Sequence, residues 1–377
     1  MKKLLALVLA LLGILSLLPA LSARGEELPL AAPSAVLMEA STGRVLYEKN
    51  PHEVRPCASI TKVMTLCLTF EALDAGRLSL DQTLTASAHA ASMGGSDIWL
   101  KEGEQMTVDD LLKATVIMSA NDAAVVLAEA VAGTEETFVA RMNEKAAALG
   151  MKDTTFKNCN GLDEDGHVTS AYDVALMSRE LLTHPKIFDY TLTWMDSVRG
   201  GATQLVNTNK LIRTYPGITG LKTGTTGKAG SCVTATAARD GMSLIAVVLG
   251  ADTTQHRFQD AAALLDYGFA GWSVTTPEAP ELPPLPVERG LQATVPLEVG
   301  QLPALLTGAS DKESIQVEPE LPESLTAPVR RGDVVGRLRF TLAGETLATL
   351  EVTAGADVEA VTFSTALQAL LAGIFAW

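Results

Sequence analysis

A serine and a lysine at the start of an apolar run could together form a nucleophile. Ser59 and Lys62 lie three residues apart in Ala58-Ser59-Ile60-Thr61-Lys62. Residues at this spacing share one face of a helix, so a hydroxyl would lie beside an amine. If burial keeps Lys62 unprotonated, its amine can accept the Ser59 proton. The local alternative is that Ser59 caps the helix and Lys62 is a solvated residue of its first turn.

A second short motif, Ser119-Ala120-Asn121, interrupts an otherwise apolar sequence. Short hydrogen-bonding side chains in such surroundings lower stability unless each finds a partner. Ser119 and Asn121 therefore either belong to a polar site or cap a helix N-terminus, and the local sequence leaves both open.

The third motif, Lys222-Thr223-Gly224, precedes two runs rich in β-forming residues, 232–236 and 243–249. Asp240-Gly241 separates these runs, and an Asp-Gly turn in that position predicts a β-hairpin. We therefore expect the motif on or beside a strand of a sheet. Gly224 would let another backbone approach that strand closely.

The remaining sequence predicts the elements that must position these motifs. A hairpin is expected from runs 35–38 and 45–47, and a central apolar helix from Ser59 to about Ala75. Residues 92–104 should form a loop, and 159–167 a loop too polar to be buried. His167 is either a site residue or a loop histidine that binds backbone carbonyls. Further helices are expected at 108–112, 135–149, 170–183 and from Arg257 to about 269.

Length and charge limit what the chain can be. Its 377 residues are too many for one compact core, so two domains are expected. A net charge of −15 argues against a nucleic-acid partner, because phosphates attract an excess of Lys and Arg.

The N-terminus predicts export from the cytoplasm. Met1-Lys2-Lys3, an apolar run over 4–18 and small residues over 20–23 have the layout of a secretory signal peptide, residues 1–23. The mature protein should therefore work outside the cytoplasm. An uncleaved N-terminal anchor is the alternative.

The four cysteines are expected to be buried thiols, with accessibility to oxidation or thiol reagents left open for Cys57, which lies two residues before Ser59. Cys57 and Cys67 flank most of a helix, which would hold them about 15 Å apart, beyond the ~7 Å limit for a disulfide. The sequence has no CxxC and no zinc-type Cys/His spacing, and His52-Glu53 is not continued into HExxH. We therefore expect no metal site and no cofactor.

The C-terminal third predicts a separate small domain. Five prolines between 277 and 286 indicate a stiff linker, residues 273–290. Short alternating runs over 291–360 indicate a small all-β domain. Residues 361–377 form an amphipathic pattern too short to span a bilayer, which favours a helix lying on a membrane surface. Its polar face lacks Lys and Arg, so packing on the β domain or on a partner is the alternative.

The three motifs together resemble the serine/lysine signature of penicillin-recognising acyl transferases. The chain resembles the low-molecular-mass penicillin-binding proteins, which are serine-type D-alanyl-D-alanine carboxypeptidases of the peptidase S11 type. Further likeness lies in Asn207-Thr208-Asn209, in Gly220 to Thr226 and in Leu265 to Phe269. The likeness covers most of residues 30–272. It implies an α/β (α+β) β-lactamase/transpeptidase-like catalytic domain at 24–272, with a central antiparallel sheet and helices, followed by a small all-β sandwich.

The resemblance also implies roles for the first two motifs. Ser59 would attack the penultimate D-alanine carbonyl of a peptidoglycan stem pentapeptide, and Lys62 would accept its proton. Ser119 would pass a proton to the departing D-alanine, and Asn121 would hold Lys62 and a substrate amide. β-Lactam antibiotics would acylate Ser59 in the same way.

For the third motif the resemblance implies substrate binding. The strand carrying Gly224 would pair with the peptide backbone. Lys222, Thr223 and Arg257 would meet the terminal carboxylate, although Arg257 could instead be a surface cation. The backbone N–H groups of Ser59 and Thr225 would hold the oxyanion. No metal or cofactor is implied, and the site of action would be the cell wall or the outer face of the cytoplasmic membrane.

Three features depart from the family pattern, and three other activities remain open. Cys57 stands where the family often has proline, 167–171 inverts an expected Ser-Thr order, and the tail lacks basic residues. A class A-type β-lactamase is disfavoured because no Glu-x-x-Leu-Asn occurs between Asn121 and Lys222. A DD-endopeptidase, a weak β-lactamase or a non-catalytic β-lactam-binding sensor stays possible on the same fold.

Overall fold

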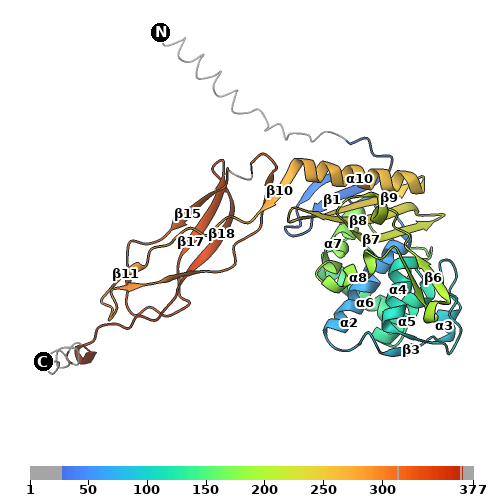
Figure 1. The fold of residues 1–377 in the computed structure, drawn as a ribbon, viewed down its shortest axis with the longest axis horizontal. Helices are drawn as coiled ribbons and strands as arrows, with labels where there is room; N and C mark the ends of the chain where they lie inside the picture. The colour runs from blue at the N-terminus through green and yellow to red at the C-terminus, as the bar shows by residue number, and fades with distance from the viewer. Residues whose placement is uncertain (1–27, 312–313, 366, 368–377) are drawn as a thin grey trace, which may run out of the picture.

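The computed structural model describes residues 28–311, 314–365 and 367 of the chain (Figure 1). The expected signal peptide, residues 1–23, lies outside the described residues. So does most of the expected C-terminal helix, of which 361–365 and 367 are described. None of the helices in the described ranges is both long enough and apolar enough to cross a bilayer.

A five-stranded antiparallel sheet organises the first part of the chain, in the order β2-β1-β9-β8-β7. Both predicted hairpins are confirmed, and Asp240 and Gly241 turn the second one with φ of 49° and 79°. The strand carrying the third motif, β7, pairs on one side with β8 and forms an edge of the sheet. The strands are β1 Ser34–Glu39, β2 Val45–Lys49, β7 Ile218–Thr226, β8 Gly230–Arg239 and β9 Met242–Ala251.

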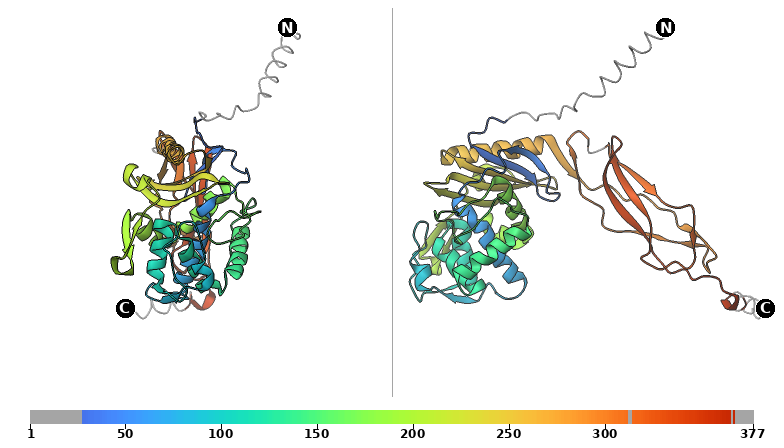
Figure 2. Two further views of the ribbon diagram at one scale, coloured as in Figure 1. Left: turned by 90° about the vertical axis from the view of Figure 1, so that its right-hand side faces the viewer. Right: turned by 180° about the vertical axis from the view of Figure 1, so that it is seen from behind.

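Helices cover both faces of this sheet because both faces are apolar. In β1, Val36 and Met38 belong to the larger core with the helical region, whereas Ala35 and Leu37 belong to the core under α10, Thr254–Gly271. This alternation is the two-residue period of a strand. Figures 1 and 2 show α10 along one face of the sheet and the helical region with α2, α5, α6 and α7 on the opposite side.

The helical region is built around α2, Lys62–Asp74, which is buried over most of its surface. The predicted helix from Ser59 to about Ala75 is confirmed with one difference. Its first turn, η1 Ala58–Thr61, is a 3-10 helix, so the α-helix itself begins at Lys62. Around it lie α4 Val108–Lys113, the π-helical turn η2 Ala114–Met118, α5 Asn121–Ala132, α6 Glu135–Ala148 and α7 Ala171–Leu181.

Short elements complete the first domain, and residues 92–104 form a loop between two of them, as predicted. These elements are β3 Thr83–Thr85, α3 Ala88–Ala91, β4 Gln105–Thr107, η3 Pro185–Ile187, α8 Phe188–Thr191, β5 Met195–Val198, η4 Arg199–Gly201, β6 Thr203–Val206 and α9 Leu211–Thr214.

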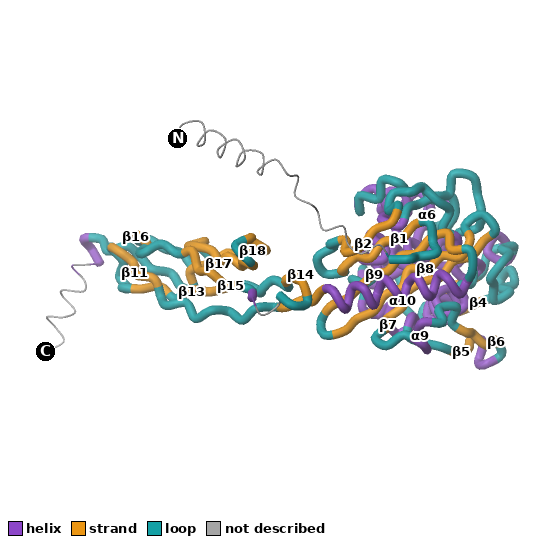
Figure 3. Tube along the Cα trace, turned by 90° about the horizontal axis from the view of Figure 1, so that it is seen from above, coloured by secondary structure: helices purple, strands orange, loops and turns teal. Residues whose placement is uncertain are grey.

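The expected linker, residues 273–290, differs from the structure at both ends. Helix α10 leads directly into β10, Trp272–Thr275, which pairs with β14, Leu305–Gly308. The other end holds β11, Leu285–Glu288. The irregular part of the linker is therefore limited to residues 276–284. Pro286 lies inside β11, since a strand tolerates proline at a position where its N–H is not needed for pairing. Figure 3 shows β14 beside the C-terminal end of α10.

The last part of the chain is all-β, as predicted. One sheet has the order β12-β11-β16 and another the order β13-β18-β17-β15. Two small cores, centred on Val295 and on Phe340, fill this domain. Its remaining strands are β12 Thr294–Val295, β13 Leu297–Val299, β15 Gln316–Glu320, β16 Leu325–Thr326, β17 Val334–Leu342 and β18 Glu345–Ala354.

Candidate active site

Ser59 and Lys62 lie together at the start of α2. Lys62 Nζ is 3.2 Å from Ser59 Oγ and also donates to Asn121 Oδ1 (2.5 Å) and to the carbonyl of Asn160 (2.7 Å). Lys62 is fully buried, and this burial lowers its pKa to about 7. The alternative of a solvated first-turn lysine is therefore wrong. Ser59 is half-buried and lies inside η1, whose cap position is Cys57, so it is not a cap.

The hydrogen bonds of Lys62 allow it to act as a base. A protonated amine has three N–H donors, and Ser59, Asn121 and Asn160 offer three acceptors. Loss of one proton leaves a lone pair. Because Asn121 Oδ1 and the Asn160 carbonyl can only accept, that lone pair faces the Ser59 hydroxyl, which can donate to it.

Ser119 and Asn121 hydrogen-bond the buried lysines Lys222 and Lys62 and do not cap a helix. The N-cap positions of η2 and α5 are Lys113 and Ala120, and neither side chain makes a capping hydrogen bond. Ser119 follows the π-helical turn η2 with φ of 68°, and its Oγ accepts from Lys222 Nζ at 2.8 Å. Asn121 is the first residue of α5, and its Nδ2 donates to the carbonyl of Gly94 at 2.6 Å. The capping alternative is therefore wrong.

Lys222 projects from β7 into the same buried space. It is 1% exposed, and its Nζ donates to Ser119 Oγ and to the Thr223 carbonyl at 3.1 Å. Burial holds its pKa well below the usual range, and the nearby charges of Lys62 and Arg257 act in the same direction. The Ser119-Ala120-Asn121 motif therefore hydrogen-bonds both lysines, Lys62 through Asn121 and Lys222 through Ser119.

Gly224 marks the point where β7 approaches η1, the turn that carries Ser59. A Cβ added there would lie 2.6 Å from the Cys57 carbonyl oxygen and 3.0 Å from Ser59 N. Only glycine permits this approach, which confirms the reason expected for Gly224. The neighbouring Thr223 hydroxyl donates to Thr208 Oγ1 at 2.7 Å.

Arg257 lies behind β7 and is 6% exposed, so the surface-cation alternative is wrong. Its Nη1 donates to the Gly224 carbonyl (3.0 Å) and to Thr225 Oγ1 (2.8 Å). Burial lowers the pKa of its guanidinium. The guanidinium therefore positions Thr225 and adds positive charge close to it.

The loop after α6 contains site residues that the sequence did not reveal. Residues 159–167 were expected to be too polar for burial, yet Cys159, Asn160 and His167 are buried. The expectation is wrong because the polar groups have partners: the Cys159 carbonyl accepts from Thr65 Oγ1, and the Asn160 carbonyl accepts from Lys62. Residues 162–166 remain exposed.

Asp122 is a second residue that sequence reasoning missed. Its carboxylate accepts from the backbone N–H groups of Ile98 (3.2 Å) and Leu100 (2.9 Å), and Asn121 N–H donates to the Ser96 carbonyl (2.6 Å). The start of α5 therefore fixes the loop 92–104 beside the site. The sequence feature that could have indicated Asp122 is its position directly after the Ser119-Ala120-Asn121 motif.

All four cysteines are free and buried, as predicted. Burial raises the pKa of Cys57 to about 12, so this thiol two residues before Ser59 is unreactive at neutral pH. Among the described residues, no group of three or more His, Cys, Asp or Glu side chains is placed to hold a metal ion.

Comparison with known proteins gives the family. A family described as D-alanyl-D-alanine carboxypeptidase matches residues 22–253, and the C-terminal domain of penicillin-binding protein 5 matches residues 282–360. The chain belongs to the D-alanyl-D-alanine carboxypeptidase family. As a member of this family it is a low-molecular-mass penicillin-binding protein and a serine hydrolase.

Relatives and solved structures agree with this assignment. The chain is 41% identical over 380 residues to the D-alanyl-D-alanine carboxypeptidase DacF of Bacillus subtilis, covering 98% of this chain and 97% of the relative. It is 34% identical over 341 residues to DacC of Escherichia coli, covering 86% and 85%. Penicillin-binding protein 5 of Haemophilus influenzae has a similar structure, with a TM-score of 0.76, 28% identity and coverage of 89% and 99%.

A related structure carries a β-lactam. Penicillin-binding protein D2 of Listeria monocytogenes, solved in its ampicillin-bound form, is 37% identical with a TM-score of 0.60 and covers 65% of this chain and all of its own.

Proposed function

We propose that Ser59 is the nucleophile of this D-alanyl-D-alanine carboxypeptidase and that neutral Lys62 is its general base. One observation carries the proposal: a fully buried Lys62 amine, its pKa lowered to about 7, lies 3.2 Å from the Ser59 hydroxyl. A base with a pKa near the working pH is the one that transfers protons most effectively.

The reaction then proceeds in two steps. Ser59 Oγ forms a bond to the penultimate D-alanine carbonyl carbon while Lys62 takes its proton. The C–N bond to the terminal D-alanine breaks, and Ser119, linked to Lys222 by the 2.8 Å hydrogen bond, delivers a proton to the departing amine. The proton that Lys62 took from Ser59 restores the Ser119 hydroxyl, so Lys62 is neutral again. Water then attacks the acyl-enzyme with Lys62 as its base, and the proton taken from water returns to Ser59 as the ester bond breaks. A β-lactam acylates Ser59 in the same way and leaves slowly.

Backbone groups and β7 would hold the substrate. The N–H groups of Ser59 and Thr225 bind the oxyanion, each contributing roughly 3 kcal/mol to the stability of the transition state. The edge of β7 pairs with the extended peptide beside Gly224. Lys222, Thr223 and the Arg257–Thr225 pair face the terminal carboxylate.

One experiment distinguishes this function from its alternatives. Purified protein is incubated with a D-Ala-D-Ala pentapeptide, with a cross-linked peptide dimer and with benzylpenicillin, and free D-alanine and adduct mass are followed. D-Alanine release with a long-lived Ser59 adduct supports the proposal. Cleavage of the dimer alone indicates an endopeptidase, fast drug hydrolysis a β-lactamase, and an adduct without peptide turnover a sensor. An adduct on Ser59→Ala would refute the assignment.

We further propose that residues 1–23 export the chain, that the catalytic unit spans 24–272, and that 361–377 bind a membrane surface. The exposed Phe363, 86% accessible at the start of the last helical segment, supports the membrane contact. The mass of the exported protein gives the cleavage point. Vesicle flotation of the mature chain should fail when it ends at residue 360, and equal flotation of both would contradict the contact.

A further inference from the structure

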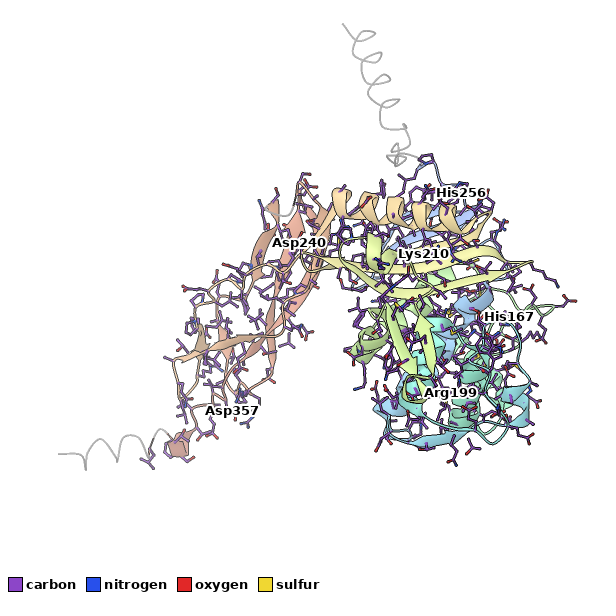
Figure 4. All side chains as sticks on the ribbon, turned by 45° about the vertical axis from the view of Figure 1, so that its right-hand side comes forward. His167, Arg199, Lys210, Asp240, His256 and Asp357 are labelled. Atoms are coloured by element: carbon purple, nitrogen blue, oxygen red, sulfur yellow. The ribbon has the colours of Figure 1, made fainter. Side chains whose placement is uncertain are left out.

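A chain of hydrogen bonds that the proposed reaction does not use ends on the residue before the nucleophile. His167 Nε2 lies 2.7 Å from Thr61 Oγ1, and Thr61 Oγ1 donates to the Ala58 carbonyl at 2.8 Å. His167 and Thr61 are buried, at 4% and 0% exposed, so water does not compete for these bonds. Figure 4 labels His167 on its loop in the catalytic domain.

The direction of each bond in the chain is fixed. The backbone N–H of Lys157 donates to His167 Nδ1 at 3.0 Å, so Nδ1 must carry the lone pair. The neutral ring then has its proton on Nε2 and donates it to Thr61 Oγ1. Because Thr61 Oγ1 accepts from His167, its own proton is free to bind the Ala58 carbonyl. Burial lowers the pKa of His167 to about 4, which keeps this neutral form at neutral pH.

The chain of hydrogen bonds ends on Ala58, whose backbone conformation needs support from its surroundings. Ala58 has φ of 50°, a left-handed conformation that is uncommon for a residue other than glycine. Such conformations persist where the surroundings hold them. Gly161 lies so close that a Cβ there would be 2.0 Å from the Ala58 oxygen. The Thr61 hydroxyl holds that oxygen with a hydrogen bond.

Holding this carbonyl also orients the N–H of Ser59. The Ala58 C=O and the Ser59 N–H belong to one planar peptide group and point in opposite directions. Fixing the oxygen therefore fixes where the N–H points. A donor to the carbonyl also polarises the peptide group, which makes its N–H a stronger donor.

We propose that His167, acting through Thr61, is a positioning residue that aims the Ser59 N–H at the developing oxyanion. The inference rests on the proposed function, because it assigns the N–H of Ser59 to the oxyanion site. His167 itself touches no reacting atom. Its effect should appear in the rate of acylation more than in initial binding, because the oxyanion exists only after Ser59 attacks.

The test measures, by stopped flow, the first-order acylation constant and the apparent dissociation constant for benzylpenicillin. Thr61→Val and His167→Phe delete the hydrogen bonds and keep the approximate shape. Each should slow acylation about tenfold to a hundredfold and change the dissociation constant less than about threefold. Thr61→Ser keeps the hydroxyl and should stay within about threefold of wild type. The double variant should be no slower than the slower single variant, because both act through one chain.

A matched control separates positioning from stability. Like Thr61, Thr69 of α2 is a fully buried threonine whose hydroxyl donates to a backbone carbonyl, in this case that of Thr65 at 2.8 Å. Thr69→Val should lower the melting temperature about as much as Thr61→Val and leave acylation unchanged. Should His167→Phe not fold, the Thr61→Val, Thr61→Ser and Thr69→Val comparison decides alone.

Three results would overturn the inference. In the first, Thr61→Val acylates as fast as wild type. In the second, Thr61→Ser acylates as slowly as Thr61→Val. In the third, the fold-losses in acylation rate of Thr61→Val and His167→Phe multiply in the double variant. Absence of any adduct on the wild-type protein would instead refute the proposed function and this inference with it.

Discussion

At the scale of single residues, three basic side chains are buried in the site, Lys62, Lys222 and Arg257, and burial affects their charge unequally. It lowers the pKa of Lys62 to about 7 and holds that of Lys222 well below its usual range. Burial also lowers the pKa of Arg257, but a guanidinium keeps its charge in proteins. Arg257 is therefore the permanent positive charge of the site, and it is joined to Thr225 by a 2.8 Å hydrogen bond.

Replacing Arg257 should consequently weaken recognition of the carboxylate. For Arg257→Gln we expect kcat/KM for a D-Ala-D-Ala pentapeptide to fall about tenfold to a hundredfold, the effect of losing one charged hydrogen bond. The same peptide with a C-terminal amide is the control, because it has no carboxylate to lose. An equal loss on acid and amide would show that Arg257 acts only by holding β7.

Residue spacing predicted the nucleophile and base but not every partner. Ser59 and Lys62 are recognisable because a helical turn fixes the distance between residues three apart. The third partner of Lys62 is the backbone carbonyl of Asn160, and a carbonyl leaves no trace in residue type. The left-handed Ala58 was equally hidden, since alanine is not a residue that usually marks such a turn.

At the scale of elements, the loop 158–167 forms one wall of the nucleophile turn, and Gly161 is its point of contact. Gly161→Ala would place a Cβ 2.0 Å from the Ala58 oxygen, at a φ of 89°. Because the loop would have to move away, we expect acylation to slow more than about tenfold and unfolding free energy to fall about 1–3 kcal/mol. Stopped-flow acylation and urea unfolding measure the two effects.

Gly166 supplies the matched control for this substitution. Its φ of 82° is similar, but the nearest atom to an added Cβ is the flexible Lys157 Cε at 3.4 Å. Gly166→Ala should therefore show the cost of the φ angle alone, with acylation close to wild type. Equal slowing in both variants would mean that the contact with Ala58 is unimportant.

The loop 92–104 depends on the start of α5 in the same way. Asp122→Ala removes the acceptor of two backbone N–H groups of this loop, and we expect the amides of Ile98 and Leu100 to exchange with deuterium at least about tenfold faster. Because Asn121 contacts the same loop, turnover should fall as well. Substitution of the exposed Asp81 is the control, and unchanged exchange in Asp122→Ala would contradict this role.

The sequence predicts helices and strands correctly where the hydrophobic periodicity is strong. It does not predict the burial of a polar loop, because burial there depends on which polar groups find hydrogen-bond partners. The apolar run after Ser59 and the Asp240-Gly241 turn gave α2 and the β8–β9 hairpin correctly. The polar loop 159–167 was expected to be exposed because composition does not show which polar groups will find hydrogen bonds. In the structure Cys159 and Asn160 are buried, and their carbonyl groups accept hydrogen bonds from Thr65 and Lys62.

At the scale of the whole molecule, the β domain is joined to the catalytic domain by paired strands. Leu306 of β14 is 7% exposed and belongs to the hydrophobic core under α10. Leu306→Ala should therefore lower the free energy of unfolding of the catalytic domain by about 2–4 kcal/mol. Leu291→Ala, at a site 45% exposed, is the control.

Far-UV circular dichroism in urea, with the helical signal reporting on the catalytic domain, measures this effect. An unchanged helical transition in Leu306→Ala would show that the two domains unfold independently. The prolines between 277 and 286 did suggest a boundary, but sequence could not reveal that β10 would pair with a strand some thirty residues later, because strand pairing is a long-range contact.

The proposed mechanism requires above all that Lys62 is neutral in the working enzyme. The acylation constant for benzylpenicillin should be measured from about pH 5 to about pH 9. Because the neutral amine is the base, a pKa lowered to about 7 predicts a plateau above that pH and half the plateau rate at it. Below it the rate should fall about tenfold for each pH unit, and Lys62→Met should be slower by at least about a hundredfold throughout. A rate independent of pH, or a Lys62→Met variant that acylates like wild type, would contradict the account.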